Sequence, residues 1–343
     1  MTPLILKKYL GIDLGSDSTL LYLKGAGVVV SEPSIIAFNS RTNRIVAVGA
    51  EAKKMLSRTP AHITATRPIN HGIIADFDVT KAMLEFFLKN KKMPWSWLTE
   101  AIVSVPTNLT EVERKSVEDL LKEVGANKVY LIEQPLAAAL GSHLDINQPT
   151  AYLIVDIGAG TTDMAVVSMN GVVISNRLKI AGNRLNSDII RAIKDEFKLY
   201  IGEPTAEEIK IAVGSAIPHQ EKLEIAVRGR EVASGLPGEM TIKDTNVRLW
   251  LQPALKQLVE GVKDLIEATP PELVGDIYKN GLFLCGGGSL LRGIDILFQK
   301  ELGIGVKIVD EPLSCVVRGT GLIAEKFGEY KYIFNNFSKI KNR

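Results

Sequence analysis

The segment Ile12-Asp13-Leu14-Gly15-Ser16-Asp17-Ser18-Thr19 returns in altered form as Val155-Asp156-Ile157-Gly158-Ala159-Gly160-Thr161-Thr162. Both segments read apolar, Asp, apolar, Gly, two variable residues, a hydroxyl residue and Thr. Asp13 and Asp156 are 143 positions apart (156 − 13), about the length of one domain. Each segment ends one β-rich run and is followed by another, so each is predicted to be a hairpin turn. The repeat therefore predicts two similarly built halves.

Strand-like and helix-like stretches alternate along the chain. Short runs at residues 20–23, 28–30 and 35–38 are typical of strands, whereas residues 79–89 have the apolar spacing of a helix. This alternation predicts an α/β fold.

One helix has clear signals at both ends. Thr110 and Glu113 form a capping box at its start, and Gly125 is suited to its end. The helix is expected to connect short strands at residues 101–105 and 128–132.

The two repeated turns have the composition of an anion-binding site. A tight turn with glycine exposes backbone N–H groups, and Ser or Thr hydroxyls donate further hydrogen bonds to phosphate. Either turn alone would be read as an ordinary hairpin, but a matched pair favours nucleotide binding. Asp13 and Asp156 would then face the phosphates, which is repulsive unless a cation lies between them. Mg²⁺ suits this position, because carboxylates can orient its bound waters.

A third glycine cluster, Gly286-Gly287-Gly288-Ser289, follows a strand-like run and is expected to open a helix. This arrangement lets a ligand approach the backbone at a helix N-terminus. Neither this cluster nor the turn at residues 158–163 supplies G-x-G-x-x-G, and the Walker pattern is absent from the sequence, so the two best-known nucleotide motifs are not the basis of the site.

The composition excludes several classes of protein. The 343 residues are 46% apolar, enough to bury two lobes, and the formal net charge of +2 gives no reason to expect nucleic acid as a partner.

Cys285, Cys315 and the four histidines fit no metal-ligand spacing, so the cysteines are interpreted as core residues in a reducing compartment. No apolar run approaches the roughly 20 residues that span a bilayer, and the start does not resemble a secretory signal. A cytoplasmic protein is expected.

The turns and the triple glycine resemble the phosphate and adenosine motifs of the actin superfamily, which includes actins, heat-shock chaperone ATPases and sugar kinases. Further segments are similar to the MreB family of bacterial actin homologues, and the chain is identified as a member of it over about residues 9 to 327. These segments are 31–35, 47–56, 67–78, 104–114, 227–230 and 312–321.

The resemblance implies an actin-like α/β fold of two lobes, each with a ribonuclease-H-like core, and four subdomains around a nucleotide cleft. The implied ranges are 1–32, 66–145 and 315–343 for subdomain IA, 33–65 for IB, 146–181 and 246–314 for IIA, and 182–245 for IIB.

The resemblance also implies ATP and Mg²⁺ as cofactors, with Asp13 and Asp156 holding the metal through water. Glu207 and Lys210 would flank the adenosine, although by themselves they read as a solvated helix face. The implied nucleotide-binding residues are Asp13, Gly15, Ser16, Asp17, Ser18, Asp156, Gly158, Gly160, Thr161, Thr162, Glu207, Lys210, Gly286, Gly287, Gly288 and Ser289.

The implied reaction is attack of a positioned water on the γ-phosphate, with Gln134 and Thr161 at the matching positions. Pro135 suits a first helical turn, so Gln134 lies at a strand-to-helix junction where side chains tend to face a cleft. The family usually has Glu where this chain has Gln134, and glutamine orients water without accepting its proton. Slow hydrolysis is therefore expected, with Glu133 as the alternative acid and a non-hydrolysing scaffold as the alternative function.

A second departure from the family is Asp17-Ser18, where Ala-Asn is common. A carboxylate in a phosphate turn should weaken nucleotide binding unless it points outward or meets the metal.

Two segments suggest contact with a membrane. Met93, Trp95, Trp97 and Leu98 follow a lysine cluster, and tryptophan and lysine both favour the membrane interface. The resemblance implies an inserting loop at this place, aided by an apolar N-terminus at Leu4, Ile5 and Leu6; the alternative is that the tryptophans cap the next strand. Residues 330–343 are expected to fray, and the alternative is that they form a further surface-binding element.

The resemblance implies a slow ATPase that polymerises beneath the inner membrane and helps to determine cell shape. Its implied partners are further copies of itself, the inner membrane surface and the cell-wall elongation machinery.

Two other functions of the superfamily are less well supported. A sugar kinase would need a catalytic aspartate and a sugar pocket, for which no motif is found. A chaperone ATPase would need a separate substrate-binding domain, for which the sequence leaves no room.

Overall fold

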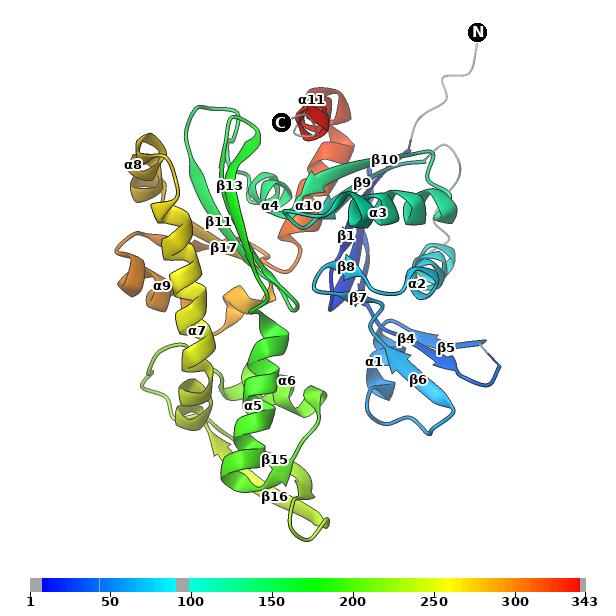
Figure 1. Ribbon diagram of the computed structural model, residues 1–343, viewed down its shortest axis with the longest axis vertical. Coiled ribbons are helices and arrows are strands. Elements are labelled where there is room, and N and C mark those ends of the chain that lie inside the picture. The colour runs from blue at the N-terminus through cyan, green and yellow to red at the C-terminus, as the bar shows by residue number, and fades with distance from the viewer. Residues whose placement is uncertain (1–7, 43, 91–98, 340–343) are drawn as a thin grey trace.

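The computed structural model describes residues 8–42, 44–90 and 99–339, which form two lobes, each around a five-stranded sheet (Figure 1). The first sheet has the order β10-β9-β1-β2-β3, and the second has the order β13-β12-β11-β17-β18. The strands of the first sheet are β1 (Lys8–Leu14), β2 (Ser18–Leu23), β3 (Gly27–Pro33), β9 (Thr99–Val105) and β10 (Lys128–Glu133). Those of the second sheet are β11 (Tyr152–Ile157), β12 (Thr162–Ser168), β13 (Gly171–Leu178), β17 (Leu282–Cys285) and β18 (Val306–Ile308).

The two sheets share one topology. In each, three strands form an antiparallel meander, and two further strands add in parallel beside the first. This is the ribonuclease-H-like arrangement that the resemblance implies. The repeated segments connect the first two strands of each sheet, since Leu14 pairs with Thr19 and Ile157 pairs with Thr162. The prediction of two equivalent hairpin turns is confirmed.

Helices cover both sheets, and small sheets extend each lobe (Figure 1). The helices are α1 (Ala50–Met55), α2 (Phe77–Asn90), α3 (Glu111–Val124), α4 (Gln134–Gly141), α5 (Gly182–Phe197), α6 (Glu203–Val213), α7 (Asp244–Glu267), α8 (Pro271–Asn280), the 3₁₀ helix η1 (Gly287–Leu290), α9 (Ile294–Leu302), α10 (Cys315–Glu325) and α11 (Phe327–Lys339). The small sheets contain β4 (Ile36–Asn39), β5 (Arg44–Val48) and β6 (Ile63–Thr66); β7 (Ile69–Asn70) and β8 (Ile73–Ile74); and β14 (Leu199–Tyr200), β15 (Glu224–Glu231) and β16 (Pro237–Lys243).

Each lobe has its own apolar core, and a third core joins them. The first core packs the first sheet against α2 and α3, and the second packs the second sheet against α5, α6 and α7. The third contains α4, α10 and residues from both sheets. It includes Cys285 and Cys315, which are both buried and form no disulfide. Burial of this shared apolar surface holds the two lobes together.

The helices α4 and α10 cross at the centre of this third core. Each follows the last strand of one sheet and packs against the other sheet. Their backbones touch, because a Cβ atom on Gly141 would lie 1.9 Å from the carbonyl oxygen of Cys315. A Cβ atom on Gly319 would lie 1.8 Å from that of Ala137. This contact fixes the position of α4 and hence of Gln134 at its start.

The end signals of α3 act as predicted. The Thr110 hydroxyl accepts a hydrogen bond from the Glu113 N–H at 3.2 Å, and the Glu113 carboxylate accepts one from the Thr110 N–H at 2.8 Å. Gly125 ends the helix in the left-handed conformation. The helix connects β9 to β10, as expected.

The chain was predicted to fray from residue 330. This prediction is wrong for residues 330–339, because α11 continues to Lys339. Phe327 stacks on Tyr9 with ring centroids 4.6 Å apart, and Phe334 lies 4.9 Å from Tyr130. These partners come from β1 and β10, so the stabilising contacts are remote in sequence.

The predicted membrane residues Leu4, Ile5, Leu6, Met93, Trp95, Trp97 and Leu98 lie outside the described residues. Within the described ranges, the helices are all too short or too polar to cross a membrane. The ranges given for the four subdomains stay a prediction.

Candidate functional site

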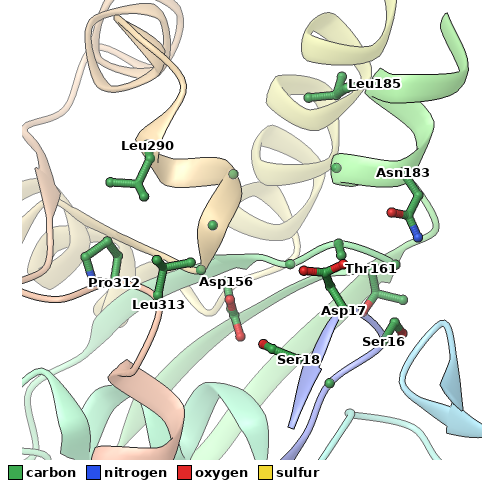
Figure 2. Close-up of a pocket in the computed structure, with 18 of the residues that line it drawn as sticks. Ser16, Asp17, Ser18, Asp156, Thr161, Asn183, Leu185, Leu290, Pro312 and Leu313 are labelled. Atoms are coloured by element: carbon green, nitrogen blue, oxygen red, sulfur yellow. The ribbon is translucent and has the colours of Figure 1, made fainter. Parts of the chain in front are cut away.

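A cavity of about 500 Å³ lies between the two lobes (Figure 2). Its wall includes both repeated turns, the start of α4, parts of α5 and α6, and the glycine-rich loop at η1. The predicted residues that line it are Asp13, Gly15, Ser16, Asp17, Ser18, Gln134, Asp156, Gly158, Gly160, Thr161, Glu207, Lys210, Gly286, Gly287 and Gly288. Residues more than 270 positions apart thus surround one space.

The two turns are closed by equivalent hydrogen bonds. The N–H of Gly15 donates to the carbonyl of Ser18 at 3.0 Å, and that of Gly158 donates to the carbonyl of Thr161 at 2.9 Å. The final threonine of each segment is buried and supports its turn from behind. The Thr19 hydroxyl lies 2.8 Å from that of Ser34, and the Thr162 hydroxyl donates to the Ile180 carbonyl at 2.6 Å. Thr162 therefore holds the second turn in shape and does not line the cavity.

The turn between β7 and β8 joins the two repeated turns. The N–H of Gly72 donates to the Ser16 hydroxyl at 2.8 Å, which leaves the proton of that hydroxyl free for a ligand. His71 Nδ1 lies 2.8 Å from the carbonyl oxygen of Gly160, so Nδ1 carries the proton in this contact. Sequence reasoning missed this role of His71 and Gly72. The available signal was the turn composition Asn-His-Gly at residues 70–72.

Two buried carboxylates lie at the ends of the central strands. Burial raises the pKa of Asp13 to about 6, although hydrogen bonds with Ser104 and Gln134 partly oppose the rise. Burial and the nearby charges of Asp13 and Asp163 raise the pKa of Asp156 well above its ordinary value. A cation would stabilise both carboxylates in their charged form. The carboxylate pair therefore fits the implied Mg²⁺.

Gln134 and Glu133 face different surroundings. Gln134 is the first residue of α4, lines the cavity and hydrogen-bonds Asp13. Glu133 is the last residue of β10 and does not line the cavity. Burial raises the pKa of Glu133, and the positive charge of Arg114 partly opposes this. Of the two, Gln134 is the one placed to contact a ligand.

Asp17 does line the cavity, but two cations neutralise its carboxylate. Its Oδ1 lies 3.7 Å from an Nη of Arg67, and its Oδ2 lies 3.9 Å from Nζ of Lys53. The expected repulsion between Asp17 and a bound phosphate is therefore reduced.

Part of the cavity wall is aliphatic. Ile211, Leu290 and Leu313 line it, and each side chain is more than half exposed. Exposed aliphatic groups inside a concave site are suited to the faces of a flat apolar ring. The sequence did not predict these three residues, because an aliphatic residue that lines a cavity cannot be told from a core residue until its exposure in the folded chain is known.

Lys210 and the glycine loop also line the cavity. Burial lowers the pKa of Lys210, while the negative charge of Glu207 opposes the decrease, and the ammonium donates to the Gly182 carbonyl at 3.3 Å. Ser289 is buried, and its hydroxyl donates to the Gly286 carbonyl at 2.7 Å. Ser289 therefore supports the loop and does not line the cavity.

Comparison with known proteins places this chain in a family. A family model described as MreB/Mbl protein matches residues 7–332. The chain belongs to the MreB/Mbl family. The cell shape-determining protein Mbl of Bacillus subtilis is 41% identical over 317 residues, which cover 92% of this chain and 95% of that protein. The cell shape-determining protein MreB of Escherichia coli K12 is 44% identical over 324 residues, covering 92% and 93%.

Solved structures agree with this MreB/Mbl assignment. The crystal structure of MreB5 of Spiroplasma citri bound to AMPPNP has a TM-score of 0.92 at 36% identity and covers 95% of this chain and 98% of that one. The MamK double helical filament has a TM-score of 0.78 at 22% identity, covering 93% and 98%, which shows likeness of fold alone. The actin-like fold implied by the sequence is confirmed.

Proposed function

We propose that this MreB/Mbl protein binds ATP with Mg²⁺ in the cavity, hydrolyses it slowly, and polymerises into filaments that help to determine cell shape. The observation that carries the proposal is that two equivalent glycine turns from different lobes face one cavity. Two such turns provide backbone N–H groups from both sides of a polyphosphate chain. The binding of AMPPNP and ADP by the MreB5 relative supports this assignment.

In this proposal the residues of the cavity divide into phosphate and adenosine ends. The turns at Gly15 and Gly158 bind phosphates, and the Ser16 hydroxyl donates a hydrogen bond to a phosphate oxygen. Asp13 and Asp156 would hold Mg²⁺ through water, and the metal would supply charge neutralisation at the phosphates. The adenosine lies between the glycine loop and α6, against the apolar wall formed by Ile211, Leu290 and Leu313.

Gln134 sets the rate in this proposal. Its amide, held at the start of α4 and bonded to Asp13, orients the attacking water. An amide has no capacity to take the water's proton at neutral pH, so the step relies on orientation and charge stabilisation. Thr161, in the second turn, positions the γ-phosphate next to that water.

The Gln134→Glu variant tests the catalytic part of the proposal. We expect phosphate release with ATP and Mg²⁺ to rise by about 10-fold to 100-fold, because a carboxylate adds general-base catalysis. Phosphate release and sedimentation are measured on the same samples, so that polymerisation is followed independently. Equal rates for wild type and variant would contradict the role of Gln134. A lack of sediment with any nucleotide would contradict polymerisation itself.

The alternative is a non-hydrolysing scaffold, which Gln134 specifically favours. It predicts ATP-dependent polymers without phosphate release in the wild type. The same experiment separates it from the main proposal.

We also propose that the filaments bind the inner face of the cell membrane through Leu4, Ile5, Leu6, Met93, Trp95, Trp97 and Leu98 and there recruit the cell-wall elongation machinery. The sequence composition supports this part. A single short loop binds weakly, and polymerisation multiplies the contacts.

Flotation with vesicles of anionic phospholipid tests the membrane contact. Replacing both Trp95 and Trp97 with alanine should lower the binding constant for the vesicles at least about tenfold, because two large apolar side chains no longer enter the interface. Tyr278→Ala is the control, since Tyr278 is an exposed aromatic residue on α8. Equal loss in both variants, or in neither, would contradict the assignment.

A further inference from the structure

Five charged side chains connect the two lobes along one edge of the cavity. Arg67 lies 3.2 Å from Glu203, and Lys53 lies 3.8 Å from Glu207. Asp17 contributes a third carboxylate, 3.7 Å from Arg67 and 3.9 Å from Lys53. We call this group, Asp17, Lys53, Arg67, Glu203 and Glu207, the clasp.

The members of the clasp come from opposite lobes. Lys53 is on α1 and Arg67 directly follows β6, both in the small β5-β4-β6 unit that extends the first lobe, and Asp17 is in the first turn. Glu203 and Glu207 are on α6, whose apolar residues belong to the core of the second lobe. Movement of one lobe away from the other would therefore separate the cations from both glutamates.

The Arg67–Glu203 contact has the geometry of a specific pair. One Nη of Arg67 donates to Oε2 of Glu203 at 3.2 Å, and the other lies 3.2 Å from Oε1. Such a two-pronged contact fixes the relative orientation of both groups as well as their distance. The Arg67 side chain is only 18% exposed, so solvent screens the pair less than an open surface pair.

The clasp and the cavity share residues. Asp17 and Glu207 line the cavity and also contact the cations of the clasp. A ligand in the cavity thus lies against the contacts that hold the lobes together. Glu207 further connects the clasp to Lys210, whose pKa decrease on burial is opposed by Glu207 and Asp17.

We infer that the clasp retains the bound nucleotide by holding the lobes closed, with Arg67 as its central positioning residue. This inference rests on the proposed nucleotide site. A ligand enclosed between two lobes leaves when they separate, and separation requires the ion pairs of the clasp to break. The Asp17 carboxylate, directed at Lys53 and Arg67, belongs to this closing device.

Nucleotide release is the quantity to measure. A fluorescent ATP analogue carrying a methylanthraniloyl group is bound to the full-length protein with Mg²⁺ and chased with excess ATP in a stopped-flow instrument. Arg67→Gln and Glu203→Gln should each accelerate release about 5-fold to 10-fold. The double variant should be no faster than Arg67→Gln alone, because Arg67→Gln already removes the contact with Glu203. Glu123→Gln is the matched control, since it removes the 2.8 Å Lys81–Glu123 pair within the first lobe, and it should leave release unchanged.

Two further measurements keep the inference falsifiable if a variant folds poorly. The conservative variant Arg67→Lys, which keeps a positive charge beside both Glu203 and Asp17, should accelerate release less than Arg67→Gln does. Higher ionic strength should accelerate release from the wild type more than from Glu203→Gln, because this variant lacks one of the two cross-lobe pairs that salt screens. Unchanged release in both single variants, or a salt effect of equal size in wild type and variant, overturns the clasp. A wild type that binds no fluorescent nucleotide overturns the proposed function instead.

Discussion

Replacing Gly286 with alanine is expected to lower ATP affinity by more than about 100-fold. Gly286 has φ 76°, in the left-handed region. A Cβ atom there would lie 2.3 Å from Oδ1 of Asp156 and 2.5 Å from the carbonyl oxygen of Ile157. Overpacking of this kind costs about 1–3 kcal/mol, and the left-handed conformation adds about 1–2 kcal/mol. The strain is relieved by displacing the glycine loop or Asp156, and either displacement spoils the site.

Gly303→Ala is the matched control for Gly286→Ala. Gly303 has a similar φ of 70° at the end of α9, but a Cβ atom there has no heavy atom within 4 Å. This variant therefore carries the backbone cost without the steric overlap, and its ATP affinity should equal that of the wild type. Equilibrium binding of a fluorescent ATP analogue measures both variants. Similar affinities for Gly286→Ala and Gly303→Ala would show that the loop tolerates the overlap.

Replacing Gly319 with alanine is expected to prevent stable folding. A Cβ atom on Gly319 would lie 1.8 Å from the carbonyl oxygen of Ala137 and 2.6 Å from its carbonyl carbon. Both are backbone atoms in the interior of α4, so no side-chain rotation relieves the overlap. The helices must separate, which opens the core that joins the lobes. The loss should exceed about 4 kcal/mol, a large part of the about 5–15 kcal/mol that holds a typical domain together.

Gly328→Ala is the control for Gly319→Ala. Gly328 is also helical, in α11, and a Cβ atom there meets nothing within 4 Å. Alanine should stabilise this helix by up to about 1 kcal/mol, because glycine has the lower helix propensity. Urea unfolding followed by circular dichroism measures both variants. A cooperative transition for Gly319→Ala close to the wild-type midpoint would contradict the backbone contact between α4 and α10.

Much of the fold was predictable because its signals are local. The capping box at Thr110 and the glycine at residue 125 act within one helix, and they predict α3 correctly. The repeated turns are equally local, since each is closed by hydrogen bonds between near neighbours such as Gly15 and Ser18. By contrast, α11 was missed at residues 330–339, because its aromatic partners Tyr9 and Tyr130 lie far away in sequence.

The candidate site was predicted at the level of motifs more than of individual side chains. The turns and the glycine loop do line one cavity, and so does Gln134. Thr162 and Ser289 belong to the same motifs, yet their hydroxyls bond to backbone carbonyls behind the cavity wall. A motif indicates which residues lie near a ligand, whereas the direction of each side chain depends on the backbone around it.

By itself, the sequence determined the two equivalent halves, the α/β class, the two hairpin turns and the family. These properties follow from residue patterns over short stretches, where hydrogen bonding and steric preference act between neighbours. Only the tertiary structure decided that His71 and Gly72 join the two turns, that α4 and α10 meet at glycines, and that Arg67 of one lobe contacts Glu203 of the other. Those contacts bring together residues that are distant in sequence, and their geometry exists only after the two lobes have packed around their shared core.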